Sequence, residues 1–222
     1  YADVKLWVKN GWIDYNMPQI YWEIGHTAAD YKTLIEWWAN NNFGQPLYIG
    51  QDIKRTMDAT TQPSGDNQLA EKMLLSRSFA TVHGNCFWPA YELLDNYKGI
   101  ASRLQSNYHK YPALIPAYTH MYKKQPKKVS NLKESFTATT HTLQWDAKSD
   151  KYDPETAQYY VVYRFAKGEK ENLENAQNIV SITRQKSIVL PYEGGAKEYK
   201  YVVTAVDAFH NESKGKSKKL KL

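Results

Sequence analysis

Apolar residues form short runs along the first half of the chain, and polar or glycine-containing stretches separate these runs. The first run lies within residues 12–23 and follows an Asn-Gly pair. A short apolar run between chain breakers is typical of a strand that is buried on both faces of a parallel sheet. We therefore expect such a strand here. Its apolar members are Ile13, Tyr15, Met17 and Ile20.

Two further apolar runs, at 46–53 and 81–88, predict two more strands, and helical periodicity separates the three. One helix is predicted by Tyr31, Leu34, Ile35 and Trp38, which recur at positions i, i+3, i+4 and i+7. Strands that alternate with helices, at a spacing of about 35 residues, indicate βα units and a parallel sheet. The other predicted helices are the tail of a helix before Gly11, a helix begun by Asp66, and one at 100–108. Residues 54–65 are expected to form a long loop.

A complete (β/α)8 barrel takes about 250 residues, and residues 1–122 hold about three units. We therefore expect a partial, TIM-like barrel, and a chain that is the C-terminal part of a longer protein. Prolines and lysines mark a boundary near residue 125. Beyond it the hydrophobic period changes to two, and about seven short strands indicate a β-sandwich in residues 127–222. The expected fold class is thus α/β followed by all-β.

The end of the first predicted strand carries large aromatic residues among hydrogen-bonding groups. In barrels of this kind, the C-terminal ends of the strands carry the chemistry. Gln19, Tyr21 and Trp22, together with Trp88 at the end of the third strand, are therefore candidate substrate-binding residues. Aromatic rings beside amide and carboxylate groups suit a sugar, which has an apolar face and hydroxyl edges. The alternative is that Tyr21 and Trp22 serve only in core or rim packing.

Glycoside hydrolysis uses two carboxyl groups, of which one protonates the leaving oxygen and the other is a nucleophile or activates water. Acids at the predicted strand ends are Glu23, Asp52 and Glu92. Glu23 and Asp52 follow adjacent strands, so we select them as candidate catalytic residues. Surface carboxylates are the alternative. His26, just after the first strand, is a candidate for hydrogen bonding to substrate, although a structural role is also open.

Charge and cysteine content narrow the other functional classes. The net charge is +6, but residues 1–122 carry 10 basic and 11 acidic side chains, and the remaining 19 basic and 12 acidic ones lie in 123–222. Much of the excess lies in runs at a linker and at the terminus, where charge is usually solvated, so we expect no nucleic-acid partner. The single cysteine, Cys86, is expected in the core. No pattern of metal ligands, phosphate-binding loop or membrane span occurs, so no metal, cofactor or transmembrane segment is expected in this chain.

Several motifs of the second half match a known family. Trp145 in LQW, the central YVVYR strand, Leu190, Tyr199 and the VDAFHNES hairpin resemble a fibronectin type III domain, except that His210 stands where glycine is usual. This resemblance covers about residues 127–222 and implies a β-sandwich without catalytic residues.

The first half resembles a bacterial glycoside-hydrolase-like family related to glycoside hydrolase family 10, at the C-terminal end of its barrel. The matching pieces are GWIDYNMPQIYW, the DY…LIEWWAN helix, LYIGQ and HGNCFW. The resemblance implies an exported hydrolase, secreted, periplasmic or on the cell surface, that acts on a polysaccharide or glycan. A non-catalytic glycan-binding or spacer protein is the alternative. Three units cannot close a barrel, so this chain alone is expected to be inactive, and its open edges could self-associate. The sugar, the linkage and the stereochemical outcome are not determined by the sequence.

Overall fold

The chain forms two compact units, residues 1–110 and 111–222. The computed structural model describes residues 2–60, 65–119, 121–148, 153–192 and 194–222. The boundary lies earlier than the expected linker near residue 125. Residues just after 110 already belong to the second unit, because Leu114 packs against its core. The backbone N–H of Tyr118 also donates a hydrogen bond of 2.9 Å to the carbonyl oxygen of Phe209.

Three helices of the first unit, α1, α2 and α3, begin at a side chain that caps them. The carboxylate of Asp30 accepts a hydrogen bond from the backbone N–H of Thr33, as suits an N-cap, and the predicted helix follows. The prediction that Asp66 begins a helix is wrong, since Gln68 holds the cap position. Part of the expected loop at 54–65 is helical, and residues 61–64 of that loop lie outside the described residues. The helical segments are α1 (Val4–Lys9), α2 (Tyr31–Asn40), α3 (Ile53–Asp58), α4 (Leu69–Ser78), α5 (Ala90–Leu94), a 3₁₀ turn (Tyr97–Gly99) and α6 (Ile100–Arg103), which continues as a π-helical turn (Leu104–Tyr108).

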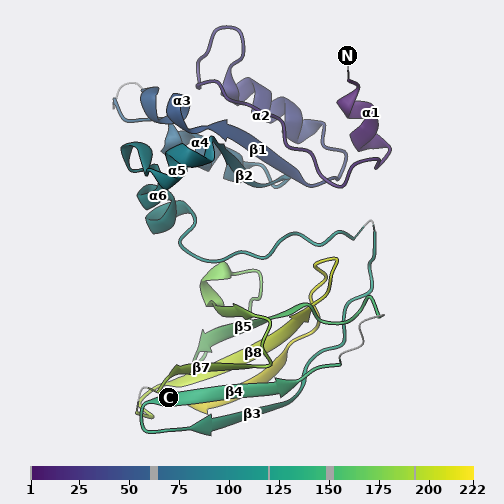
Figure 1. The fold of residues 1–222 in the computed structure, drawn as a ribbon, viewed down its shortest axis with the longest axis vertical. Helices are drawn as coiled ribbons and strands as arrows, with labels where there is room; N and C mark the ends of the chain where they lie inside the picture. Colours follow the sequence, from purple (N-terminus) through teal and green to yellow (C-terminus); the bar gives the residue numbers. More distant parts are fainter. Residues whose placement is uncertain (1, 61–64, 120, 149–152, 193) are drawn as a thin grey trace. The chain divides into compact units, whose positions relative to one another are not determined.

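Two of the three predicted strands are confirmed, and they pair in parallel. β1 (Leu47–Asp52) lies beside β2 (Val82–Trp88), with Asp52 opposite Trp88 at their carboxyl ends. Figure 1 shows α2 running alongside this pair. Each strand runs almost directly into a helix, β1 into α3 and β2 into α5. The βα order expected from the sequence is therefore present at both strands.

The first predicted strand is not a regular strand. Residues 16–20 run parallel to β1 and form isolated bridges between Asn16 and Leu47 and between Gln19 and Gly50. The backbone N–H of Ile20 donates to the Gly50 carbonyl oxygen of β1 at 3.0 Å, and that of Asn16 donates to the Pro46 carbonyl oxygen, just before β1, at 2.9 Å. Between them lies Pro18, which has no N–H to donate, so the ladder loses one hydrogen bond. An interrupted ladder therefore replaces the continuous strand that the apolar pattern predicted.

This parallel array is covered on one face, whereas burial on both faces was expected. Ile20, Leu47 and Ile49 pack against Tyr31 and Ile35 of α2 in a core that is almost fully buried. The opposite face carries partly or largely exposed side chains, because α2 and α4 pack against the first face. Residues on that opposite face include Tyr15, Met17, Tyr48, Cys86 and Trp88.

Cys86 lies on this uncovered face and is exposed, so its predicted place in the core is wrong. Its neighbours Asn85 and Phe87 point to the helix-covered face, and strand alternation directs Cys86 the other way. The apolar residues around it in the sequence therefore gave no information about its own burial.

The second unit is a sandwich of two antiparallel sheets, as the two-residue period predicted. Its seven described strands fall into a three-stranded sheet of order β3-β4-β7 and a four-stranded sheet of order β6-β5-β8-β9. Trp145 of β4 is 1% exposed and meets Tyr160 of β5 edge-on, with ring centroids 5.5 Å apart. The two sheets thus share one core. The strands are β3 (Ser130–Phe136), β4 (Thr140–Asp146), β5 (Tyr159–Ala166), β6 (Ile179–Thr183), β7 (Ser187–Pro191), β8 (Glu198–Val206) and β9 (Lys216–Lys221), with a 3₁₀ turn at Ala176–Asn178.

Candidate functional site

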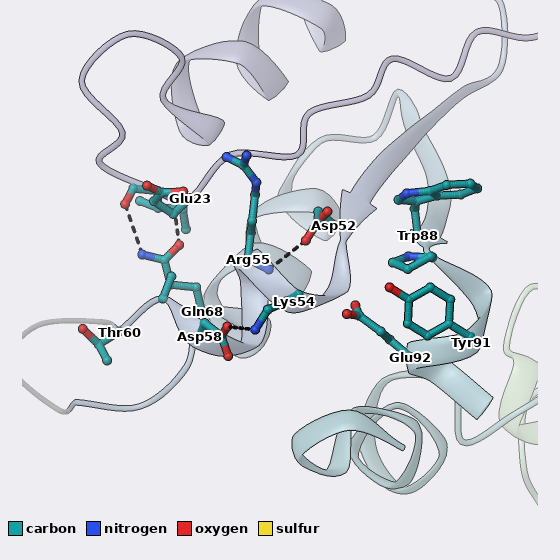
Figure 2. A pocket seen from close by; sticks show the side chains of 13 residues that line it. Glu23, Asp52, Lys54, Arg55, Asp58, Thr60, Gln68, Trp88, Tyr91 and Glu92 are labelled. Carbon is teal, nitrogen blue, oxygen red and sulfur yellow. Dashed lines mark hydrogen bonds and ion pairs between the residues drawn. The ribbon is translucent and has the colours of Figure 1, made fainter. Parts of the chain in front are cut away.

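An open cavity of about 760 Å³ lies in the first unit, at the carboxyl ends of β1 and β2. Its walls come from the loop after residues 16–20, from β1 and α3, and from the β2–α5 connection (Figure 2). Parallel strands present their carboxyl ends at the same edge, which is why segments far apart in the sequence meet here. The lining residues are Glu23, Ile24, Asp52, Lys54, Arg55, Asp58, Ala59, Thr60, Gln68, Trp88, Pro89, Tyr91 and Glu92.

Asp52 ends β1 and begins α3. One of its carboxylate oxygens accepts a hydrogen bond of 2.7 Å from the backbone N–H of Arg55. This N-cap bond satisfies one of the free N–H groups of the short helix. The carboxylate is therefore held at the cavity wall by its own helix, and one of its oxygens already has a protein partner.

The β2–α5 connection places two exposed aromatic rings beside a buried carboxyl group. Trp88 and Tyr91 are 58% and 62% exposed, and both line the cavity. Glu92 lines it as well but is only 7% exposed. This segment therefore combines flat apolar surfaces with a hydrogen-bond acceptor.

Gln68 fixes the loop that carries Glu23. The backbone N–H of Ile24 donates to the side-chain oxygen of Gln68 at 2.7 Å, and the Gln68 amide nitrogen donates back to the Ile24 carbonyl oxygen at 3.1 Å. Gln68 is almost fully buried. A paired amide contact of this kind reproduces a backbone ladder, so the loop next to Glu23 is anchored to the start of α4.

Lys72, on α4, binds the same loop through its buried side chain. Its side chain is fully buried, and its ammonium group donates to the Trp22 carbonyl oxygen at 2.9 Å and to the Thr56 hydroxyl at 3.0 Å. The ammonium nitrogen lies 4.6 Å from the centre of the Tyr31 ring. Burial lowers the pKa of Lys72 to about 8, against the opposing effect of the Glu23 and Asp52 charges.

A charged cluster surrounds Asp58 at the end of α3. The carboxylate of Asp58 contacts the ammonium groups of Lys54 and Lys98 at 2.7 and 2.6 Å. It also accepts a hydrogen bond of 2.8 Å from the Tyr97 hydroxyl. Hydrogen bonds from Lys54, then from Lys98 and Tyr97, hold the pKa of Asp58 well below its usual range. The carboxylate of Asp58 thus makes structural contacts, although the residue lines the cavity.

The cavity brings together three of the residues selected from the sequence. Glu23, Asp52 and Trp88 line it. The remaining four lie elsewhere on the same unit: Gln19, Tyr21, Trp22 and His26.

Each of these four has a different setting. Gln19 is exposed beside β1, and Trp22 is half-buried, with its carbonyl oxygen bound by Lys72. Tyr21 is half-buried, and burial, followed by the nearby Cys86 and Asp52 groups, raises the pKa of its hydroxyl. The His26 ring nitrogen accepts backbone hydrogen bonds from Ala28 and Ala29 at 3.3 and 3.1 Å, which gives it a structural role in its own turn.

Sequence reasoning did not select Tyr91, Gln68 or Lys72, and it named Glu92 only as an acid near a strand end. The position of Glu92, shortly after the third strand, is a usable signal. No local signal marks Gln68 and Lys72, because their partners lie 44 and 50 residues earlier in the chain.

Among the described residues, no group of three or more His, Cys, Asp or Glu side chains has an arrangement that could hold a metal ion. Within the same residues, no helix combines the length and apolarity needed to cross a membrane.

Comparison with known proteins defines the class to which this fold and site are related. Residues 1–65 match the family model described as glycosyl hydrolase-like 10. The matched segment includes Glu23 and Asp52 of the cavity. The resemblance to a glycoside-hydrolase-like family, expected from the sequence, is therefore confirmed.

Two curated relatives carry related names. The chain is 33% identical over 225 residues to the glycosyl hydrolase YngK of Bacillus subtilis, a match that covers all of this chain and 44% of that protein. It is 50% identical over 52 residues to the glycosyl hydrolase DigH of Escherichia coli, covering 22% of this chain and 12% of that protein. The chain thus spans less than half the length of either relative. Among solved structures, FN3tt matches 44% of this chain and 94% of its own, with 14% identity and a TM-score of 0.32.

Proposed function

We propose that this chain is the C-terminal part of a glycoside hydrolase and that its cavity forms part of a cleft for a polysaccharide or glycan. The observation that carries the proposal is the meeting of Glu23, Asp52 and the exposed Trp88 ring in one cavity at the carboxyl ends of parallel segments. The match of residues 1–65 to a glycosyl hydrolase-like family supports the same reaction class.

The aromatic residues give the cavity its fit to a sugar. One face of a pyranose ring is formed by C–H groups, which pack against flat aromatic rings, while the hydroxyl edges need polar partners. Trp88 and Tyr91 offer such rings, and the neighbouring carboxylates offer acceptors. A sugar ring lying against Trp88 would therefore have acidic groups within the same cavity.

In the proposed reaction, Glu23 and Asp52 are the acid and base candidates. One carboxyl group protonates the departing glycosidic oxygen, and the other attacks the anomeric carbon or activates water. The loop with Glu23 is anchored by Gln68 and Lys72, and Asp52 is anchored as the cap of α3. Fixed carboxylates of this kind satisfy the positional demand of the reaction.

The test is hydrolysis of a panel of hexasaccharides from cellulose, xylan, chitin and mannan by the whole protein. We expect turnover of at least one sugar, a loss of at least 100-fold in Glu23→Gln or Asp52→Asn, as typical for acid–base groups, and no loss in the exposed control Glu36→Gln. The isolated 222 residues should be inactive. No turnover by the whole protein on glycans to which it binds would reject the enzyme.

A non-catalytic glycan-binding or spacer protein is the second candidate, and the cap contact of Asp52 favours it. A carboxylate that already accepts the Arg55 N–H has less freedom to act as a nucleophile. If the protein only binds glycans, binding should survive Glu23→Gln and Asp52→Asn and be lost in Trp88→Ala. Titration of each variant with the panel sugars, followed by tryptophan fluorescence, separates the two candidates.

The partial barrel belongs to this proposal as well. The parallel array has helices on one face, while Trp88 and Cys86 are exposed on the other, which would line the interior of a closed barrel. The sandwich, which resembles fibronectin type III domains, is an accessory module in this proposal. The proposal also places the whole protein outside the cytoplasm, in the periplasm or at the cell surface. Self-association through the open array is the alternative use of its edges, and light scattering of this chain against the whole protein distinguishes the two.

A further inference from the structure

Glu92 is a buried acid, and one of its two carboxyl oxygens is unsatisfied within the described part of the chain. Its residue exposure is 7%, and its Oε2 atom is buried without any hydrogen-bond partner among the described residues. Two other acids of the cavity, Asp58 and Asp52, differ in this respect. Asp58 has two ammonium groups and a hydroxyl, and Asp52 has the Arg55 N–H.

Such a group is costly to the fold. An unsatisfied buried polar atom costs roughly 1–3 kcal/mol, and more when it is charged. Buried acids are normally paired or hydrogen-bonded for this reason. A chain that keeps Glu92 unpaired therefore gains no evident stability from it, and its use has to be sought in what enters the cavity.

The setting of Glu92 indicates what would satisfy it. The residue lines the cavity, and Figure 2 shows its carboxyl group directed away from α5 toward the interior. Trp88 and Tyr91, both more than half exposed, line the same cavity on the same connection. A ligand that stacks on a ring and donates hydroxyl hydrogen bonds matches all three side chains.

We propose that Glu92 is a third substrate-contacting carboxyl group of the cavity, which accepts hydrogen bonds from hydroxyl groups of a sugar ring packed against Trp88 and Tyr91. The proposal rests on the glycan-binding function proposed above and adds to it. Glu23 and Asp52 lie on other segments of the wall, so Glu92 gives the aromatic side of the cavity its own polar contact.

The experiment measures binding and stability together in the whole protein. Glu92→Gln keeps the shape of the side chain and removes its charge, and Glu92→Ala removes the acceptor. Glu36→Gln, on the exposed side of α2, is the matched control. Each protein is titrated with the hexasaccharide that the wild type binds most tightly in the panel, and each is melted without sugar.

We expect the dissociation constant to rise at least tenfold in Glu92→Gln and further in Glu92→Ala, with no change in Glu36→Gln. The melting temperature of Glu92→Gln should equal or exceed that of the wild type, since no protein contact is lost. A rise in dissociation constant of threefold or less would overturn the proposal. So would a clear loss of thermal stability, which would show that the carboxyl group serves the fold.

The two proposals fail in different ways. If the wild type binds none of the panel sugars, the glycan-binding function is rejected, and the role of Glu92 with it. If the wild type binds and Glu92→Gln binds equally well, only the role of Glu92 is rejected.

Discussion

The ammonium group of Lys72 donates a hydrogen bond of 2.9 Å to the carbonyl oxygen of Trp22, which lies 50 residues earlier in the chain. This contact joins α4 to the loop that carries Glu23. Thr56 of α3 shares the same ammonium group at 3.0 Å. One buried side chain of α4 therefore connects the loop of Glu23 with α3.

Lys72 should make stability depend on pH in the alkaline range. Burial lowers its pKa to about 8 in the folded protein, whereas an unfolded lysine titrates near 10.4. Between these values the unfolded state binds more protons, so the free energy of unfolding should rise with pH. Below pH 8 both states are protonated and this contribution is constant.

The comparison is with Lys72→Met, which has no amine. Urea unfolding at pH 7, 8, 9 and 10 should show the wild type gaining stability relative to the variant, by roughly 1.4 kcal/mol for each unit of lowered pKa. Comparing the two proteins cancels the titration of tyrosines, which both share. If the free energies of unfolding of the two proteins run parallel over this pH range, the pKa of Lys72 is not lowered in the folded protein.

A side chain at Gly50 should destabilise the first unit. A Cβ atom there would lie 3.0 Å from the carbonyl oxygen of Pro18 and 3.2 Å from Cα of Gln19. Both are backbone atoms, held close by the hydrogen bond of 2.9 Å from the Gly50 N–H to the Pro18 oxygen. Gly50→Ala should therefore lower the free energy of unfolding by about 1–3 kcal/mol, as overpacking commonly does.

Gly84→Ala provides the control for Gly50, in the neighbouring strand. Its Cβ atom would meet the ring of Tyr48 at 3.2 Å, and a side chain can move where a backbone cannot. The loss measured by urea unfolding should be smaller. Equal losses at the two positions would mean that the backbone of residues 16–20 yields as easily as a tyrosine ring.

Asp58→Asn should lower stability slightly, and the loss should depend on salt and pH. The ion pairs with Lys54 and Lys98 are exposed, so salt screens them. Because the pKa of Asp58 is lowered in the folded state, its stabilisation is present above the unfolded value near 3.9 and is lost as the pH falls.

Melting temperatures at low salt and in 1 M NaCl, each at pH 7 and pH 3, test the Asp58 prediction. Asp95→Asn serves as the control, since Asp95 is exposed and its carboxylate forms no ion pair with any described residue. The difference between the two variants should shrink in high salt and at pH 3. A difference that is constant across the four conditions would assign the effect to shape rather than to charge.

Trp145→Ala should be the most damaging of these changes. The side chain is 1% exposed and packs between the sheets of the sandwich, so its removal leaves a large cavity. We expect a loss of about 3–5 kcal/mol in the free energy of unfolding. Val189→Ala on β7, at a position that is 64% exposed, should change it by about 0.5 kcal/mol at most. Similar denaturation midpoints for the two variants would contradict this account of the core.

The sequence alone determined those features that depend on local spacing. The period of α2, the parallel strands β1 and β2, and the two-residue period of the sandwich all follow from which positions must be buried. It also placed Glu23, Asp52 and Trp88 at strand ends. A periodic pattern shows which side of a helix or strand is buried, and this is sufficient to predict such features.

Tertiary structure decided which side chains share the cavity and what each one contacts. Pro18 interrupts a ladder only because its missing N–H falls in register with β1. Gln68 and Lys72 reach partners 44 and 50 residues away. Glu92 stands apart only because no described group satisfies its buried oxygen. The register between distant segments sets these contacts, and no pattern within one segment encodes that register.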